Sequence, residues 1–370
     1  MGRPDGTAVG AAVPWPPGRA DMIVVDACDE WSPLREVVVG TAYGAMFPAE
    51  DPRMIEATMP REHWAEFRPG HPFPSWIVEA AEQELQALAE LLESLGSVVH
   101  RPRRVPWSGL GGYCAAMPRD SLLVLGNRVV EAPMAWRSRR HELLAYWPLL
   151  QQFRQSGAHW LPSAVDLAVD PLTSGPSRSG QWVIGEGRPA WDAADFLRLG
   201  PRTLVGQLSH VTNRSGIAHL RTQLGPDTRV HLIQPDDPHA MHIDATLCPL
   251  REGLALYNPE RLDPAQLAGS PMEGWELVPA PVPELRDSPP LYMTSPWVNM
   301  NLLVVDHQHV LTEARDEKLQ ALLVSYGMTP LPLPFRNVQA LGGSFHCATL
   351  DLRRDRRRTE TRGSAGATGG

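Results

Sequence analysis

The sequence predicts an α/β protein in which one unit, a strand hairpin followed by a helix and another strand, recurs along the chain. Hairpins are indicated where two short apolar runs flank a turn, as at residues 122–131, 245–257 and 302–312. A helical pattern and a further apolar run follow each hairpin, although the copies share little residue identity. Such repetition favours a radial or stacked array of modules. An ordinary mixed α/β domain is the alternative.

The chain before the first hairpin is expected to contribute a strand, a long loop, a helix and a second strand. The first strand spans 35–40, and the Pro- and Met-rich stretch 41–74 has no sustained period, which indicates a loop. Alanine and leucine at helical spacing predict a helix that begins with Ser75 as its N-cap and stops at Gly96. Residues 97–100 are expected to form the next strand.

The other elements are expected in the same order along the rest of the chain. Helices are predicted at 139–155, 215–223, 264–268 and 313–326. The apolar runs around them predict strands at 160–162, 203–206, 230–233, 275–278, 330–333 and 349–352. The polar, Pro/Ser/Gly-rich stretch 166–187 is expected to be an exposed excursion.

Composition describes a globular protein and argues against two kinds of partner. Of the 370 residues, 43% are hydrophobic and 21% are charged, which are ordinary globular values. The net charge of −8 argues against a nucleic-acid-binding surface. No apolar run reaches the roughly 18 residues that a membrane span needs. We therefore expect neither nucleic acid nor membrane as a partner, and a homodimer is left open.

The two ends of the chain and its cysteines bear on the compartment and on the domain limits. Residues 1–20 are rich in Gly, Ala and Pro and lack the apolar core of a secretory signal. The four cysteines lie far apart without a CxxC pair or zinc-ligand spacing, as expected of free thiols in a reducing cytosol. We expect a cytoplasmic protein with a disordered leader at 1–27, a single domain at 28–355 and a disordered tail at 356–370.

A Gly-rich stretch near the C-terminus, residues 341–350, is the first candidate for chemistry. It places Cys347 after Gly342 and Gly343 and just before a strand. Glycine permits positive φ and the close approach of a ligand, and a thiol becomes a nucleophile when its surroundings favour the thiolate. The alternative is a small buried side chain in a β-turn.

Acidic and histidine side chains form further clusters at expected strand ends. Asp192 and Asp195 lie in an apolar setting, where an N-cap role is the alternative. His242 and Asp244 are two residues apart, so in a strand they would share one face and one site. A solvated His–Asp face is the alternative there. Asp120 lies near the start of the strand at 122.

Two more clusters offer groups that bind a carboxylate. Arg261 follows a strand, and a guanidinium group binds a carboxylate through two parallel hydrogen bonds, although a surface arginine is the commoner case. Thr294 and Ser295 place hydroxyl groups in a turn, and turn formation alone would explain them.

Together these groups suit a zwitterionic substrate that carries a guanidinium group, such as arginine. Carboxylates would hold the cation, the arginine would hold the anion, the thiol would attack and the histidine would move protons. The sequence contains no P-loop, GxGxxG or HExxH motif.

The same residues resemble the glycine amidinotransferase and inosamine-phosphate amidinotransferase family. The similarity covers roughly residues 28–355, and its His-x-Asp and Phe-His-Cys motifs in this order are specific to the family. The stretches that carry it are 30–31, 117–120, 131–137, 192–196, 241–246 and 342–347. The resemblance implies the five-bladed pseudosymmetric α/β-propeller of the pentein superfamily, built from repeated strand–helix modules.

The resemblance also implies a role for each catalytic residue. Cys347 would be the nucleophile, His242 the proton shuttle and Asp192 the carboxylate partner of this histidine. Asp120 and Asp244 would hold the guanidinium group of the donor. No metal and no organic cofactor is implied.

For substrate binding, the resemblance implies that Arg261, Ser295 and the neighbouring Thr294 hold the carboxylate of the donor. Met241 and His239 would contact substrate near the proton shuttle. His239 departs from the glycine-specific members, which tend to carry Asn there, and Ser344 replaces the third glycine of the Gly-Gly-Gly-Phe-His-Cys form. Both departures bear on which acceptor the protein would use, and not on the chemistry of the donor.

The sequence is therefore interpreted as that of an L-arginine:amine amidinotransferase with ping-pong chemistry, whose partners are small-molecule substrates. Met241 and Asp195 look like the glycine-using branch, so glycine or another small amine is the expected acceptor. The composition suggests a GC-rich bacterial source, so an aminocyclitol or another amine of specialised-metabolite biosynthesis is an alternative. Hydrolysis of arginine to citrulline and a non-catalytic binding role are further alternatives.

Overall fold

The computed structural model describes residues 23–59, 61–63, 65–163, 172, 182–284 and 288–355 of the chain. Within these residues the strands form five separate three-stranded sheets. In each sheet the middle strand pairs antiparallel with one neighbour and parallel with the other. The strands of the five sheets are β15 (Thr349–Arg354), β1 (Leu34–Val39) and β2 (Val98–His100); β3 (Leu122–Leu125), β4 (Arg128–Glu131) and β5 (His159–Leu161); β6 (Phe196–Gly200), β7 (Thr203–Gln207) and β8 (Arg229–Ile233); β9 (Leu247–Arg251), β10 (Leu254–Tyr257) and β11 (Glu276–Pro279); β12 (Leu303–Val304), β13 (His309–Glu313) and β14 (Thr329–Leu333).

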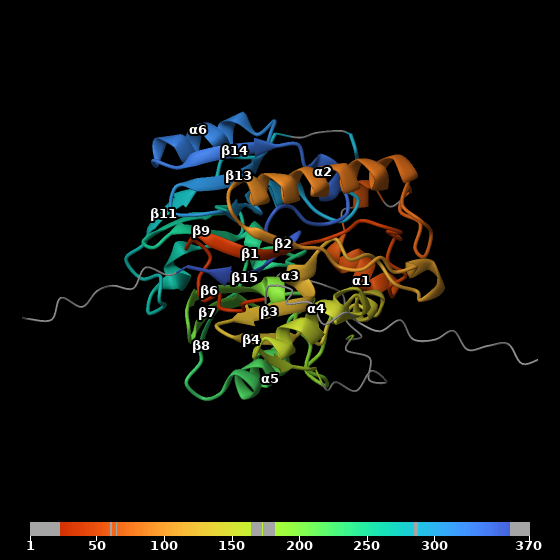
Figure 1. Cartoon of the computed structure of the whole chain (residues 1–370), viewed down its shortest axis with the longest axis horizontal. Helices are drawn as coiled ribbons and strands as arrows, with labels where there is room; N and C mark the ends of the chain where they lie inside the picture. Colours follow the sequence, from red (N-terminus) through yellow and green to blue (C-terminus); the bar gives the residue numbers. More distant parts are fainter. Residues whose placement is uncertain are drawn as a thin grey trace, which may run out of the picture.

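A helical segment connects the last two strands of every module, because parallel strands need a crossover of this kind. These segments are α2 (Ser75–Ser94), α4 (Leu143–Gln155), α5 (Arg214–Leu224), the 3-10 helix η6 (Pro264–Leu267) and α6 (Glu317–Ser325). Figure 1 shows α2, α5 and α6 at the periphery, with β1 and β15 side by side nearer the middle. The recurring hairpin–helix–strand module predicted from the sequence is thus confirmed. One module joins both ends of the chain, since β15 pairs antiparallel with β1.

Short helical turns complete the described structure. They are α1 (Pro52–Thr58), η1 (Arg61–His63), η2 (Trp107–Gly109), α3 (Pro118–Ser121), η3 (Ser138–His141), η4 (Ala193–Asp195), η5 (Ile243–Ala245), η7 (Pro296–Met300) and α7 (Arg336–Gln339). Four of them, α3, η4, η5 and η7, precede the first strand of a module, and consecutive members of this set contact each other. The turn at 345–348 holds the same place before β15. Side chains carried by these turns therefore converge.

Several predicted boundaries are corrected in the first module. The stretch 41–74, expected to be a loop, contains α1 and η1, and Asp51 caps α1 by accepting a hydrogen bond from the backbone nitrogen of Arg53 at 2.9 Å. Ser75 is the first helical residue of α2 rather than its N-cap, which is Pro74 without a side-chain hydrogen bond. The apolar face of α2 is buried as predicted, except that Leu95 follows the helix and is exposed.

Two later helices and one strand also differ from the prediction. The expected helix at 139–155 is divided into η3 and α4. The helix expected from 313 begins only at Glu317, because Glu313 ends β13 and Asp316 caps the helix through the backbone nitrogen of Leu319. Strand β6 was not predicted, since the charged Arg198 interrupts its apolar pattern.

The predicted ends and the predicted excursion fall partly outside the described residues. The described residues do not include 1–22, 164–171, 173–181 and 356–370. Of the expected leader, Ile23, Val25 and Ala27 are buried, and Ala27 pairs with Gly126. At the end of the expected excursion, residues 183–184 are buried rather than exposed.

Candidate active site

Five turns bring one buried side chain each to a common site. Asp120 lies in α3, while Asp192 and His242 hold the N-cap positions of η4 and η5. Asn301 caps the end of η7, and Cys347 lies in the turn before β15. None of the five is more than 4% exposed. Each belongs to a different module, so the packing of the modules assembles the site.

Of the two glycines before Cys347, one has the expected positive φ, and the other leaves room for neighbouring protein side chains rather than for the expected ligand. Gly342 has φ +106°, which residues with a side chain rarely adopt. At Gly343 a β-carbon would lie 2.7 Å from the β-carbon of Cys347 and 2.7 Å from the sulfur of Met117, so no side chain fits. Ser344, which departs from the family pattern, is buried, and its hydroxyl lies 3.2 Å from the amide nitrogen of Gln339.

The thiol of Cys347 contacts a carboxylate, an amide and an imidazole. Its sulfur donates to Asp244 Oδ2 at 3.1 Å and accepts from Asn301 Nδ2 at 3.0 Å. His242 Nδ1 lies 3.9 Å from the same sulfur. An acid, a proton carrier and a neutral donor thus surround one nucleophilic atom.

His242 is oriented by Asp192 from the neighbouring module. Its Nε2 lies 3.1 Å from Asp192 Oδ2, which leaves Nδ1 directed toward Cys347. His242 is the only non-glycine residue of the described chain with positive φ, at 63°, and such strain is typical of functional sites. The residues after it form η5 instead of the expected strand, so our reason for placing His242 and Asp244 together was wrong. Both nevertheless contact the thiol.

Arg139 is a site residue that the sequence reasoning missed. Its Nη1 lies 2.9 Å from Asp120 Oδ2 and 3.7 Å from Asp192 Oδ2. Its Nε and Nη2 donate to Glu142 at 2.7 and 3.1 Å. Arg139 therefore fixes the relative position of two acids. The sequence signal that could have revealed Arg139 was its spacing of three residues from Glu142, just after the stretch 131–137 that carries the family resemblance.

Behind Asp244, a series of buried ionisable side chains leads away from the thiol. His346 Nδ1 lies 3.0 Å from Asp244 Oδ2, and His346 Nε2 lies 3.3 Å from Glu30 Oε2. Glu30 accepts from Arg198 Nε at 2.8 Å, and Arg198 also pairs with Asp351. Glu30 and His346 lie in stretches that carry the resemblance, but no role was assigned to them from the sequence.

Burial and negative charge govern protonation in the site. Burial raises the pKa of the Cys347 thiol well above its ordinary value, and the carboxylates of Asp120 and Asp244 raise this pKa further. Burial would lower the pKa of His242, but the surrounding carboxylates, Asp120 first among them, raise it to about 10. At neutral pH the free site therefore holds a neutral thiol beside an imidazolium.

The same groups have the chemistry of metal ligands. One ligand atom each from Asp120, His242 and Cys347 lies within 4.8 Å of the other two. A thiol, an imidazole and a carboxylate can coordinate a metal ion, but they also make a nucleophile with an acid–base partner. The expectation that no metal takes part stays a prediction.

Of the residues expected to bind substrate, all except Asp120 and Asp244 line a cavity of ≈ 260 Å³ beside the thiol site. Arg261 Nη2 donates to Ser295 Oγ at 3.0 Å, and Arg261 Nε lies 2.8 Å from Asp237 Oδ2. The lining also includes Thr58, His239, Met241, Ala245, Met293, Thr294 and Pro296. Met241 directly precedes His242, so the cavity adjoins the thiol site.

His239 is exposed, yet its ring is held in place at the cavity. Its Nδ1 lies 2.8 Å from the backbone oxygen of Ala57 in α1, and its backbone nitrogen donates to Asp237 Oδ1 at 2.8 Å. The loop 236–241 and helix α1 thus meet at this residue.

Asp195 has a local role in the turn that follows β7. Its carboxylate accepts hydrogen bonds from Gln207 Nε2, Ser209 Oγ and Thr212 Oγ1 at 2.8, 2.7 and 2.5 Å. Thr212 Oγ1 in turn lies 3.2 Å from the backbone nitrogen of Asp192. Asp195 therefore supports the segment that carries Asp192.

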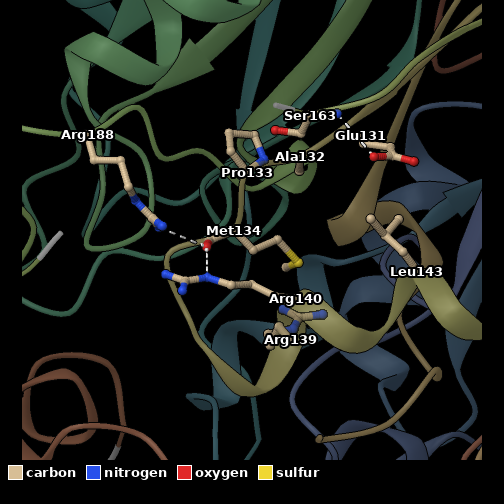
Figure 2. A pocket seen from close by; sticks show the side chains of 9 residues that line it. All are labelled: Glu131, Ala132, Pro133, Met134, Arg139, Arg140, Leu143, Ser163 and Arg188. Atoms are coloured by element: carbon tan, nitrogen blue, oxygen red, sulfur yellow. Dashed lines mark hydrogen bonds between the residues drawn. The ribbon is translucent and has the colours of Figure 1, made fainter. Parts of the chain in front are cut away.

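A second cavity of ≈ 160 Å³ is lined in part by Arg139. Figure 2 shows the guanidinium groups of Arg140 and Arg188 directed at the backbone oxygen of Met134, to which they donate at 3.2 and 3.4 Å. Glu131 stands at the opposite side and accepts from Trp160 Nε1 at 2.8 Å. Apart from Arg139, its lining is separate from the side chains described above.

Among the helices of the described residues, none combines the length and the apolar composition that a bilayer-spanning helix requires.

Two curated relatives are similar to the chain over most of its length, although no protein-family model matches it. Over 342 residues it is 41% identical to an L-arginine:L-lysine amidinotransferase of Pseudomonas savastanoi pv. phaseolicola, which covers 88% of this chain and 93% of the relative. Over 361 residues it is 37% identical to the mitochondrial glycine amidinotransferase of Danio rerio, with 92% of this chain and 85% of the relative covered.

Two solved structures are similar as well. SxtG, an amidinotransferase of the saxitoxin biosynthetic pathway from Microseira wollei, superposes with a TM-score of 0.82 at 37% identity. The inosamine-phosphate amidinotransferase StrB1 of Streptomyces griseus superposes with a TM-score of 0.77 at 34% identity. Each covers 89% of this chain and 97% of its own. With the five modules, these likenesses confirm the expected five-bladed pentein fold.

The charge around Cys347 predicts how the thiol reacts in the free protein. Alkylation by iodoacetamide, followed by peptide mass spectrometry, should reach half its maximal rate only well above pH 9, because burial and two carboxylates raise the thiol pKa. Asp244→Asn removes one negative charge, so it should move this midpoint to lower pH by about one unit or more.

Matched controls are available in the same chain. Burial raises the pKa of Cys114 to about 12, and its charged neighbours are Glu142 and Arg139 rather than Asp244, so Asp244→Asn should leave the alkylation profile of the Cys114 peptide unchanged. Asp263→Asn, at an exposed cap of η6, should leave the Cys347 profile unchanged. A wild-type midpoint at or below the ordinary thiol pKa would contradict the electrostatic description.

Proposed function

This chain belongs to the amidinotransferase family, and from that premise we propose that it moves the amidino group of L-arginine to a primary amine and releases L-ornithine. The observation that carries the proposal is the thiol of Cys347, buried between Asp244 and His242 and next to a cavity that holds Arg261 and Ser295. A site of this composition offers a nucleophile, a proton carrier and separate places for a cation and an anion.

Donor binding would use the two ends of arginine differently. The α-carboxylate would meet Arg261 and Ser295, which already share a hydrogen bond of 3.0 Å. The guanidinium would lie between the carboxylates of Asp120 and Asp244, close to the sulfur of Cys347. Such a cation offsets the charges that raise the thiol pKa, so arginine itself would favour formation of the thiolate.

In the first half-reaction the sulfur of Cys347 would lose its proton and gain the amidino group of arginine. As arginine binds, Cys347 loses its thiol proton to solvent, and the thiolate attacks the guanidinium carbon. The bond from that carbon to the side-chain nitrogen of ornithine breaks, and an amidino-thioether remains on sulfur. The leaving nitrogen gains one proton, and the His242 imidazolium supplies it. Asp192 holds His242 Nε2 at 3.1 Å, which keeps Nδ1 directed at the reaction.

The second half-reaction would reverse these changes with another amine. Neutral His242 accepts a proton from the acceptor, whose nitrogen attacks the amidino carbon, and the carbon–sulfur bond breaks. The sulfur leaves as a thiolate and regains from solvent the proton that it lost in the first half-reaction, while His242 is again an imidazolium, so no further reagent is needed. General acid–base help of this kind contributes about 10²- to 10⁴-fold in rate.

Glycine or another small amine is the acceptor we propose first. A larger amine is the second candidate, because one relative is named for L-lysine. A cytoplasmic location and a homodimer stay predictions, and the similar proteins include bacterial and mitochondrial ones.

A label experiment tests the proposed activity directly. Arginine labelled with ¹³C in its guanidino carbon is incubated with the enzyme and with glycine, L-lysine or an aminocyclitol amine, and the products are read by mass spectrometry. The label should appear in a guanidino product in equal amount to ornithine, and only when an accepted amine is present. Labelled citrulline would show a hydrolase instead, and the absence of any turnover would show a binding protein.

We further propose that the loop 236–241 selects the acceptor through His239. The variant His239→Asn shortens the side chain that bridges the cavity to Ala57, so the kcat/KM ratio between glycine and L-lysine should change by roughly 10-fold or more. Acceptor competition at saturating arginine measures this ratio. Single-turnover loading of Cys347 by arginine should keep its wild-type rate, because that step does not use the acceptor.

The matched control is His231→Asn. The ring of His231 also contacts a backbone oxygen, that of Gln266 at 2.9 Å, but this residue lies outside the lining of the cavity. Its substitution should change neither measurement. An unchanged acceptor ratio in His239→Asn, or a defect confined to arginine loading, would dismiss the loop as the selector.

A further inference from the structure

We propose that Asn301 is a positioning residue for the nucleophile: its carboxamide fixes the side chain of Cys347 and donates a hydrogen bond to the sulfur when the sulfur carries negative charge. The inference rests on the proposed role of Cys347, and it goes beyond the residues that the sequence singled out. Asn301 lies outside every stretch that carries the family resemblance.

Both ends of the Asn301 carboxamide are bound to the same residue. Its Oδ1 accepts from the backbone nitrogen of Cys347 at 3.0 Å, and its Nδ2 donates to the sulfur of Cys347 at 3.0 Å. A backbone N–H can only donate, so the amide oxygen must face it, and the amide N–H₂ must then face the sulfur. The orientation of the group thus follows from chemistry.

The fold places Asn301 where the other modules place their site residues. It ends η7, which precedes β12 in the same way that α3, η4 and η5 precede β3, β6 and β9. The turn η7 contacts η5, which carries His242 and Asp244. Asn301 is 2% exposed, and its own backbone oxygen accepts from the nitrogen of His346 at 3.4 Å.

The chemistry of the site leaves a specific task for this amide. Asp244 Oδ2, 3.1 Å from the sulfur, opposes negative charge there. His242 can offset it only while protonated, and it gives up its proton to the leaving amine. The N–H of Asn301 does not titrate, so it favours the thiolate over the thiol whenever sulfur carries charge.

The alternative is that Asn301 only fastens the turn before β15 to η7. A substitution that keeps the shape and the fastening but removes the donor separates the two roles. Asn301→Asp has nearly the same size and keeps an oxygen for the backbone nitrogen of Cys347. It replaces the N–H₂ at the sulfur with a second carboxylate oxygen.

The experiment follows formation of the arginine-dependent adduct on Cys347 in single turnovers from pH 6 to 10. In Asn301→Asp we expect a rate about 10- to 150-fold below wild type near neutral pH, as for loss of a hydrogen bond to a charged group. We also expect the pH profile to move upward by about one unit, since a like charge is added. The concentration of arginine at half-maximal rate should change much less.

The matched control is Asn299→Asp on the same turn. Asn299 Nδ2 donates to Asp316 at 2.8 Å, so this variant also sets a carboxylate against a carboxylate, but away from the thiol. Its pH profile should stay that of wild type. If Asn301→Asp does not fold by circular dichroism, Asn301→Ser, which is neutral and too short to reach both groups, takes its place and should show the same loss of rate.

A wild-type rate and pH profile in the folded Asn301 variant would overturn the inference. A shift of the same size in Asn299→Asp would overturn it too, because distortion of η7 would then suffice. Failure of the proposed function gives a different result, since the wild-type protein itself would form no adduct with arginine.

Discussion

A buried network of ion pairs at the junction of the modules is the constraint on which the site depends. Asp351 in β15 binds Arg119 of α3 at 2.6 Å, Arg354 at 2.7 Å and also Arg198 of β6. Glu30 binds Arg198 and reaches His346, which holds Asp244 against the thiol. Burial works against these charges, but the guanidinium groups still hold the pKa of Asp351 below its usual range. Removing one partner of such a pair typically costs about 3–5 kcal/mol, because the other is left buried and unpaired.

The consequence is a site whose charges are set before any substrate arrives. Asp120 is fixed by Arg139 and Asp244 by His346, so both present their carboxylates to the sulfur of Cys347. Two fixed negative charges suppress the thiolate in the free protein and would be balanced by a guanidinium cation. Selectivity for that cation and activation of the nucleophile would then have one physical cause. The cavity with Arg261 and Ser295 adds a place for an anion at a distance from the sulfur.

Local patterns in the sequence were sufficient to predict the modules, because a hairpin turn and the apolar face of a helix depend on residues that are close together in the chain. Gly126-Asn127 and the leucines of α2 illustrate this. Contacts between modules could not be read from such local patterns. Asn301 lies 46 residues from Cys347, and Arg198 lies 168 residues from Glu30, so no periodicity reveals these pairs. His242 and Asp244 were grouped for the wrong reason, because a strained residue before η5, and not a strand, directs them. The family resemblance supplied most of the site; Arg139 and Asn301 required the structure.

The central claim is that Cys347 carries the amidino group between donor and acceptor. It is tested most directly by mixing the protein with arginine in the absence of any amine, quenching in acid and measuring intact and peptide masses. The account predicts a mass increase of about 42 Da, the replacement of a thiol hydrogen by an amidino group, on the peptide that contains Cys347. It also predicts that this increase disappears when an accepted amine is added and never forms in Cys347→Ser. Turnover of arginine by folded Cys347→Ser, or an adduct on another residue, would contradict it.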